Sequence, residues 1–289
     1  MPSDYKISCP VNSRCLLGEG PVWHESSNTL FWVDILERKV FSYNLASAEV
    51  NWWQTQEYVG FIVLTPKGEI LAGYKSGLHK IALLENHEVI AQRIDTIDEL
   101  DPSIRFNDGM IDLDGSIWAC SMDMDNHHGL GKYFYYGDDL VQRIVLENYT
   151  VANGPALNNS QDKLYTVETV GNTYRVKGIY SYTITGNGCV TNEQLLIPWP
   201  YKSCPDGVFT DSFDNLWVGE FGGNILRSFT PDGILKSEIP LPAWNITKGV
   251  FCKTGENRLF ITSARIACNE EILQQYPHTG GILLIEGLK

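Results

Sequence analysis

Six glycines recur along the 289-residue sequence at intervals of 40 to 53 residues, and most of them follow a polar residue. The glycines and the residues before them are Glu19-Gly20, Val59-Gly60, Asp108-Gly109, Asn153-Gly154, Asp206-Gly207 and Lys248-Gly249. Three carboxylates that meet in one cavity repel one another and stay ionised only where a cation compensates them. Lys248 could compensate one of them. Glutamate, aspartate and asparagine oxygens also suit a hard divalent cation such as Ca²⁺, Mg²⁺ or Mn²⁺.

A simpler explanation exists for some of these positions. Asp108, Asn153 and Asp206 lie in "NDG", "NG" and "PDG", which are common turn sequences at the entry to a strand. Glu19, in "LLGEGPVWH", does not belong to this class of turn residue. Its agreement with the other repeats favours a functional site over six unrelated turns.

The segments around the glycines are strand-like and repeat in order. Each glycine opens a short apolar run, and the runs are "GPVWH", "GFIVL", "GMIDL", "GPALN", "GVFTD" and "GVFCK". A second series rich in β-branched and aromatic residues follows: "TLFWVDI", "EILAGY", "SIWACS", "KLYTVET", "NLWVGEF" and "RLFITSA". Repeats of 40 to 50 residues built only from strands are typical of a β-propeller. The sequence therefore predicts an all-β, six-bladed β-propeller that forms a single domain over residues 1–289.

The ends of the chain are predicted to share one blade. Only 40 residues follow Gly249, with three strand signals, so a strand near Lys6–Arg14 is expected to complete the last blade and close the ring. The best candidate for a helical turn is "CNEEILQQY" in the same unit. Because the first strand of each blade lines the channel, the six glycine-linked positions are expected to face one shared space.

Composition limits the partners and the compartment. The net charge of −13 argues against nucleic acid or an anionic membrane as a partner, and it allows a cation or a neutral small molecule. The start, "MPSDYKISCPVNS", has neither a basic nor an apolar leader segment, so no signal peptide is expected. The seven cysteines are odd in number and contain no CxxC pair, which favours reduced thiols and a cytoplasmic protein. No obligate protein partner is implied.

Four collinear stretches carry a resemblance to a known family: "LGEGPVWHESSNTLFWVDI", "RFNDGMIDLDGSIWACSM", "NGPALNNSQDKLYTVET" and "PDGVFTDSFDNLWVGEFGGN". They resemble the gluconolactonase / senescence marker protein (regucalcin) / luciferin-regenerating enzyme family from Leu17 to about Gly281. The resemblance implies a six-bladed propeller and a metal-dependent sugar lactonase, which is a carboxylic-ester hydrolase of carbohydrate metabolism.

The same resemblance implies the roles of individual residues. Glu19, Asn153 and Asp206 correspond to the protein ligands of one divalent metal ion, and Asp206 also corresponds to the family's proposed general base. Arg105 and Asn107 correspond to residues that bind the substrate. The oxygen ligands favour Ca²⁺, while Zn²⁺, Fe²⁺, Mn²⁺ and Mg²⁺ stay open.

Several assignments keep an alternative. The family often places a glutamate where this chain reads "CSMDMDNHHG", so Asp123 or Asp125 is expected to contact the substrate instead. Arg105 has a surface salt bridge with Asp101 as its alternative, and Lys248 is either an oxyanion-stabilising group or a fixed counter-charge. His127 and His128 are expected at the pocket rim rather than at a metal.

The leading functional hypothesis is hydrolysis of a sugar lactone, such as gluconolactone or a pentonolactone, to the aldonic acid. In this reaction the metal would polarise the carbonyl, and Asp206 would take a proton from water. The alternatives are a non-catalytic propeller that binds a divalent metal or a sugar for regulation, and a hydrolase of other esters. A serine nucleophile is not favoured because the sequence contains no GxSxG.

Overall fold

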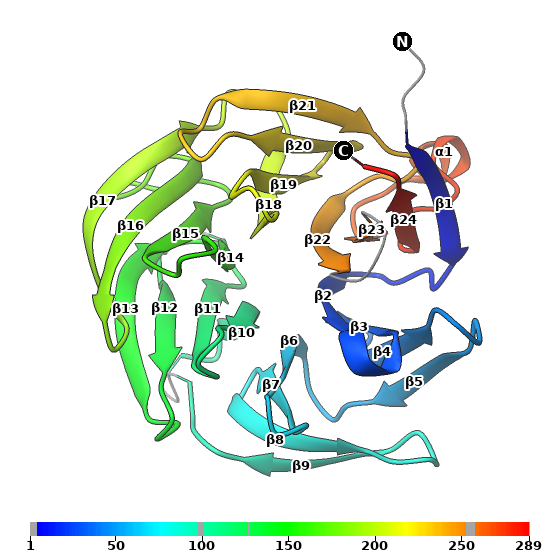
Figure 1. Cartoon of the computed structure of the whole chain (residues 1–289), viewed down its shortest axis with the longest axis horizontal. Helices are drawn as coiled ribbons and strands as arrows, with labels where there is room; N and C mark the ends of the chain where they lie inside the picture. The colour runs from blue at the N-terminus through cyan, green and yellow to red at the C-terminus, as the bar shows by residue number, and fades with distance from the viewer. Residues whose placement is uncertain (1–4, 98–100, 127, 253–257, 289) are drawn as a thin grey trace.

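The computed structural model describes residues 5–97, 101–126, 128–252 and 258–288. These residues form six four-stranded antiparallel sheets that are arranged as blades around one axis (Figure 1). The prediction of a six-bladed β-propeller is confirmed.

Each blade runs from an inner strand at the axis to an outer strand at the rim. The first two blades contain β2 (Gly18–His24), β3 (Thr29–Asp34), β4 (Lys39–Asn44), β5 (Val50–Gln54), then β6 (Val59–Leu64), β7 (Ile70–Tyr74), β8 (Gly77–Leu83), β9 (Val89–Arg93). The next two contain β10 (Ile104–Ile111), β11 (Ile117–Asp123), β12 (Gly131–Tyr136), β13 (Gln142–Tyr149), then β14 (Ala152–Leu157), β15 (Lys163–Glu168), β16 (Gly178–Gly186), β17 (Cys189–Pro198). The fifth contains β18 (Cys204–Thr210), β19 (Leu216–Phe221), β20 (Ile225–Phe229) and β21 (Leu235–Pro240).

The last blade joins the two ends of the chain. It contains β22 (Ile246–Cys252), β23 (Arg258–Ser263), β24 (Ile282–Glu286) and, outermost, β1 (Lys6–Val11). β1 pairs antiparallel with β24, with Lys6 opposite Glu286 and Ile7 opposite Ile285. The predicted N-terminal strand therefore exists and closes the ring.

The helical content of the described residues is small. A 3₁₀ turn, η1 (Glu25–Ser27), follows β2, and α1 (Glu270–Gln275) lies between β23 and β24. The Asn269 side chain caps α1 by accepting a hydrogen bond from the Ile272 N–H at 2.9 Å. The predicted helical turn in "CNEEILQQY" is thus confirmed. No helix in the described ranges has the length and apolar character needed to cross a membrane.

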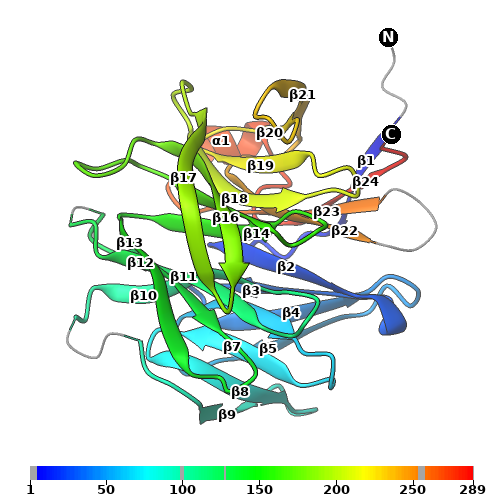
Figure 2. The ribbon, with the colours of Figure 1, turned by 60° about the vertical axis from the view of Figure 1, so that its left-hand side comes forward.

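The blades twist strongly from the axis to the rim. Figure 2 shows β14 running across the view, whereas β17, the fourth strand of the same sheet, runs down it. Apolar layers fill the space between neighbouring blades. In one of them Phe106 of β10 packs edge to face on Phe61 of β6 and on Phe134 of β12, each with ring centroids 5.6 Å apart. These layers fix the inner strands relative to one another.

The six glycine-linked positions all lie in the inner strands. In five of the six, the pairing with the next strand shifts register at or next to the glycine, and in β10 the shift lies just before Asp108. Such irregularities bend a strand and redirect its side chains. Gly20 and Gly154 adopt left-handed backbone conformations there, with φ of 54° and 44°, which only glycine adopts without strain. The glycine repeat thus records an irregularity within each inner strand, and the interpretation of these positions as turns at the strand entry is wrong.

Candidate functional site

The polar residues that precede the glycines are buried around the axis of the ring. Glu19 of β2, Asp108 of β10, Asn153 of β14, Asp206 of β18 and Lys248 of β22 expose between 1% and 7% of their surface. They come from five blades, so the fold alone gathers them. The sequence prediction that these positions share one channel agrees with this arrangement.

A chain of hydrogen bonds links three of the predicted site residues. The Arg105 guanidinium donates to Asn107 Oδ1 at 2.7 Å and to the carbonyl of the next residue at 2.9 Å. Asn107 Nδ2 in turn donates to Asn153 Oδ1 at 2.7 Å. Arg105 is buried, so the alternative of a surface salt bridge with Asp101 is wrong. Burial lowers the pKa of Arg105 to about 10, and it remains a cation near neutral pH.

The orientation of the Asn153 amide is fixed by a residue that the sequence did not reveal. Asn153 Nδ2 donates to Thr169 Oγ1 at 2.9 Å, which leaves Asn153 Oδ1 on the side of Asn107. The Tyr133 hydroxyl holds the Asn153 carbonyl at 2.7 Å. Thr169 follows β15 and ends the quoted stretch "KLYTVET", but nothing in that stretch marks it as a partner of Asn153, so only the three-dimensional contact identifies its role.

The carboxylates of the channel are close enough to perturb one another. Burial, and then repulsion from Asp108, raise the pKa of Glu19 to about 8. Burial, followed by repulsion from Glu19 and Asp108, raises the pKa of Asp206 well above its usual range. Such crowding is relieved by a bound cation. The chemistry of the side chains therefore suits a cation between Glu19 and Asp206.

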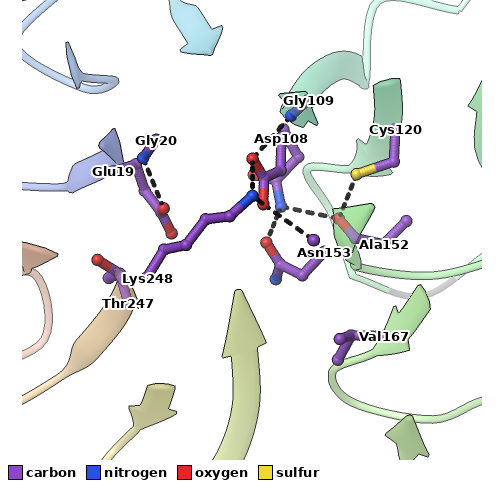
Figure 3. Close-up of polar contacts among 12 residues, drawn as sticks. Glu19, Gly20, Asp108, Gly109, Cys120, Ala152, Asn153, Val167, Thr247 and Lys248 are labelled. Atoms are coloured by element: carbon purple, nitrogen blue, oxygen red, sulfur yellow. Dashed lines mark hydrogen bonds and ion pairs between the residues drawn. The ribbon is translucent and has the colours of Figure 1, made fainter. Parts of the chain in front are cut away.

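Lys248 supplies one such cation from within the chain. Figure 3 shows its side chain reaching across the channel from β22 to β10, in the opposite blade. Lys248 Nζ lies 2.8 and 2.7 Å from the two Asp108 carboxylate oxygens. Asp108 also accepts the N–H groups of Gly109 at 2.7 Å and Gly154 at 2.9 Å. The lysine is engaged by Asp108 rather than by Glu19.

The three predicted metal ligands include only two acidic side chains and no histidine. Within the described part of the chain, no group of three or more His, Cys, Asp or Glu side chains is assembled to hold a metal ion. Glu19, Asn153 and Asp206 comprise two carboxylates and one amide. All three are buried, and the two carboxylates are crowded, so this oxygen-donor set fits a hard divalent cation.

The loop after β11 holds the two aspartates proposed for substrate contact. The Asp123 carboxylate is fully buried and accepts the N–H groups of Asp125 at 2.9 Å and His128 at 2.7 Å, so it shapes this loop. Asp125 and His128 are exposed. His127 lies outside the described residues. Of the two aspartates, Asp125 is thus the one presented toward solvent.

All seven cysteines are free thiols. Burial raises the pKa of Cys15 and of Cys252 to about 12, and it raises that of Cys120 well above its usual range. Cys120, on β11 behind the channel, donates from Sγ to the Ala152 carbonyl at 3.2 Å. These thiols pack as small apolar groups and offer no nucleophile.

Comparison with known proteins gives a consistent picture. Residues 17–265 match the model of the SMP-30/Gluconolactonase/LRE-like region. The 6-deoxy-6-sulfogluconolactonase of Pseudomonas putida is 28% identical over 277 residues, which cover 95% of this chain and 92% of that protein. The regucalcin of Sus scrofa is 27% identical over 295 residues, which cover 99% of this chain and 96% of that protein.

Solved structures share the fold over nearly the whole length. A luciferin-regenerating enzyme superposes with a TM-score of 0.88 at 20% identity and covers 98% of this chain and 96% of its own. A calcium-binding protein, the regucalcin of Agrobacterium tumefaciens, superposes with a TM-score of 0.88 at 19% identity, over 99% of this chain and 96% of that one. At these identities the superpositions establish the propeller fold.

Proposed function

The chain belongs to the SMP-30/gluconolactonase/LRE-like family, and we propose that it hydrolyses a sugar lactone to the aldonic acid with the help of one divalent metal ion. Membership in this family supports sugar-lactone hydrolysis in general terms. The observation that carries the finer proposal is the convergence of Glu19, Asn153 and Asp206, from three blades, beside the Arg105–Asn107 pair. The proposed substrate is an aldonolactone, such as gluconolactone or a pentonolactone.

Glu19, Asn153 and Asp206 would hold the metal ion through oxygen atoms. When bound, the ion supplies polarisation of the lactone carbonyl and lowers the pKa of water. Ca²⁺ is the proposed ion because all three donors are oxygens, and because a calcium-binding protein of known structure has the same fold. Mn²⁺, Mg²⁺, Zn²⁺ and Fe²⁺ are competitors in the experiment below.

The protein side chains would handle the proton and the substrate's position. Asp206, ionised when the cation is bound, would accept the proton of the attacking water. Arg105, held in place by its hydrogen bond to Asn107, donates to the hydroxyl groups of the sugar ring, and Asn107, whose Oδ1 accepts from Arg105, contacts the substrate as an acceptor. Asp125, exposed on the loop after β11, accepts hydrogen bonds from hydroxyl groups at the rim.

A reducing compartment such as the cytoplasm is the proposed location. Seven free cysteines, several of them buried as thiols, support this. The proposed partner is a small neutral lactone, because the acidic chain does not favour nucleic acid or anionic membranes.

The test is hydrolysis of a panel of five- and six-carbon aldonolactones by the full-length protein after EDTA treatment and after return of each metal. We expect a metal-restored rate above the spontaneous one for at least one lactone. Asp206→Asn should lower kcat by about 10²- to 10⁴-fold, as is usual when a general base is lost. If the protein binds the metal but hydrolyses no lactone or other ester, it is the non-catalytic binding propeller instead.

A further inference from the structure

The ion pair between Lys248 and Asp108 is an unusual feature for a cavity that is proposed to bind a divalent cation. A metal-binding channel gains affinity from each carboxylate that can reach the ion. Here one of the three carboxylates is paired with a lysine of the same chain, at 2.7 and 2.8 Å. The side chains of both partners are almost completely buried, with 9% of the lysine and 2% of the aspartate exposed.

The acceptor capacity of Asp108 is already used. Its Oδ1 accepts from Gly109 N–H and Lys248 Nζ, and its Oδ2 accepts from Gly154 N–H and Lys248 Nζ. A carboxylate offers about four lone-pair sites, so four donors leave no oxygen lone pair for a metal. Glu19, in contrast, accepts a single backbone hydrogen bond from the described residues, from Gly20 N–H to Oε2 at 3.0 Å.

The Lys248 side chain crosses the channel beside a backbone position that has no side chain. A Cβ atom at Gly207 would lie 2.7 Å from both Cβ and Cγ of Lys248 and 2.9 Å from its Cδ. The lysine stem therefore lies against Gly207, next to Asp206. The absence of a side chain at Gly207 gives the lysine the room to extend toward Asp108.

We propose that Lys248 withholds Asp108 from the metal and thereby sets the metal affinity of the channel, an inference that rests on the metal-binding part of the proposed function. The formal charges of the channel side chains show the direction in which each change should shift the metal affinity. When all carboxylates are ionised, Glu19, Asp108 and Asp206 contribute three negative charges, and Arg105 and Lys248 contribute two positive ones, which leaves a net charge of −1. Without Lys248 the net charge becomes −2, and Asp108 becomes an additional ligand. Without Asp108 the net charge becomes zero.

If Lys248 withholds Asp108 from the metal, replacing Lys248 and replacing Asp108 should change the metal affinity in opposite directions. Lys248→Met removes a positive charge and releases a carboxylate, so the metal should bind more tightly. Asp108→Asn keeps the shape of the side chain but leaves Lys248 as an uncompensated cation, so the metal should bind more weakly. A purely structural ion pair would make both variants lose metal affinity together.

The experiment measures the dissociation constants of Ca²⁺ and Mn²⁺ by isothermal titration calorimetry on the full-length protein after EDTA treatment. We expect a Kd at least about tenfold lower in Lys248→Met and at least about tenfold higher in Asp108→Asn. The double variant, which lacks both charges, should return to within about threefold of the unaltered protein. If Lys248→Met does not fold without metal, Lys248→Gln, which keeps a polar end, serves in its place.

Any pattern other than opposite shifts in the two single variants overturns the inference. If the unaltered protein binds neither ion, the metal-dependent part of the proposed function fails and the inference fails with it. If the unaltered protein binds metal and hydrolyses a lactone but the two variants shift Kd in the same direction or not at all, the inference alone fails.

Discussion

The amide nitrogen of Asn153 donates to the Thr169 hydroxyl oxygen at 2.9 Å, and this contact decides which end of the amide faces the channel. Asn153 lies at the start of the inner strand β14, whereas Thr169 follows the next strand, β15. The hydrogen bond thus joins two strands of one blade at the position where a metal ligand is proposed.

Replacing Thr169 by valine should weaken metal binding. Valine keeps the volume but removes the acceptor, so the amide of Asn153 loses one of the two side-chain hydrogen bonds that orient it and keeps only the one from Asn107. Loss of such an orienting partner typically costs about tenfold or more in metal affinity. Calorimetric titration of Ca²⁺ measures the change, and Thr169→Ser, which keeps the hydroxyl, should retain the affinity of the unaltered protein. Equal affinities for the valine and serine variants would contradict the orienting role.

Replacing Arg105 by lysine should raise KM more than it lowers kcat. Arg105 Nη1 donates to both Asn107 and the Phe106 carbonyl, which leaves the other guanidinium nitrogens for the substrate, and a lysine has no such further nitrogen. We expect KM for the best lactone to rise by about tenfold, which corresponds to about 1.4 kcal/mol. Steady-state kinetics on the panel substrate separates the two constants. A variant with an unchanged KM would exclude Arg105 from substrate binding.

The metal-free protein should become less stable as the pH rises from about 5 to about 8. In the folded state the pKa of Glu19 is raised from 4.5 to about 8, so the folded chain holds a proton that the unfolded chain has already released in this range. The free energy of unfolding therefore falls as the pH increases through this window. Thermal melts of EDTA-treated protein at several pH values measure this effect.

Two controls accompany the pH series. Glu19→Gln, which cannot ionise, should flatten the decline, although Asp206 contributes a decline of the same sign. Added Ca²⁺ should raise the melting temperature more at pH 8 than at pH 5, because the ion replaces the protons. A metal-free protein that gains stability between pH 5 and 8 would refute the crowding of the carboxylates.

Alkylation should distinguish the cysteines by burial. Cys189 is exposed, whereas Cys15 and Cys120 are buried and their thiols have raised pKa values. Iodoacetamide at pH 8 should modify Cys189 first and leave the two buried thiols intact until the protein is denatured. Peptide mapping by mass spectrometry measures the order. Cys189→Ser should remove the fast phase, and rapid modification of Cys120 would show that the inner strands open readily.

The six-bladed architecture could be predicted from the sequence because glycines and strand-like segments repeat along it at similar intervals. Each inner strand carries a glycine near an irregularity in its pairing, and the regular spacing of those glycines indicated the number of blades and the shared direction of Glu19, Asn153 and Asp206. The closing strand was predictable from the count of strand signals after Gly249. The positions of the glycines and the order of the strand-like segments can both be read directly from the sequence.

Contacts across the channel were not predictable in the same way. The choice of Lys248 to pair with Asp108 rather than Glu19 depends on the reach of a side chain across the ring and on the space over Gly207. The burial of Arg105 and the hydrogen bond to Thr169 depend equally on which strands become neighbours. Asp123 accepts two backbone N–H groups of the loop after β11, and only these hydrogen bonds distinguish its role from that of Asp125.

The pairing of β1 with β24 has a consequence for how the chain is made. During synthesis β1 emerges before the other described strands, but its partner strand begins only at Ile282, so β1 waits unpaired until the other described strands have been translated. Contacts of such long sequence separation form late and slowly. Until then the growing chain presents free strand edges, which are prone to join other chains. The pairing of β1 with β24 thus completes the last blade. A chain truncated near its carboxyl end would leave that blade incomplete and prone to aggregate.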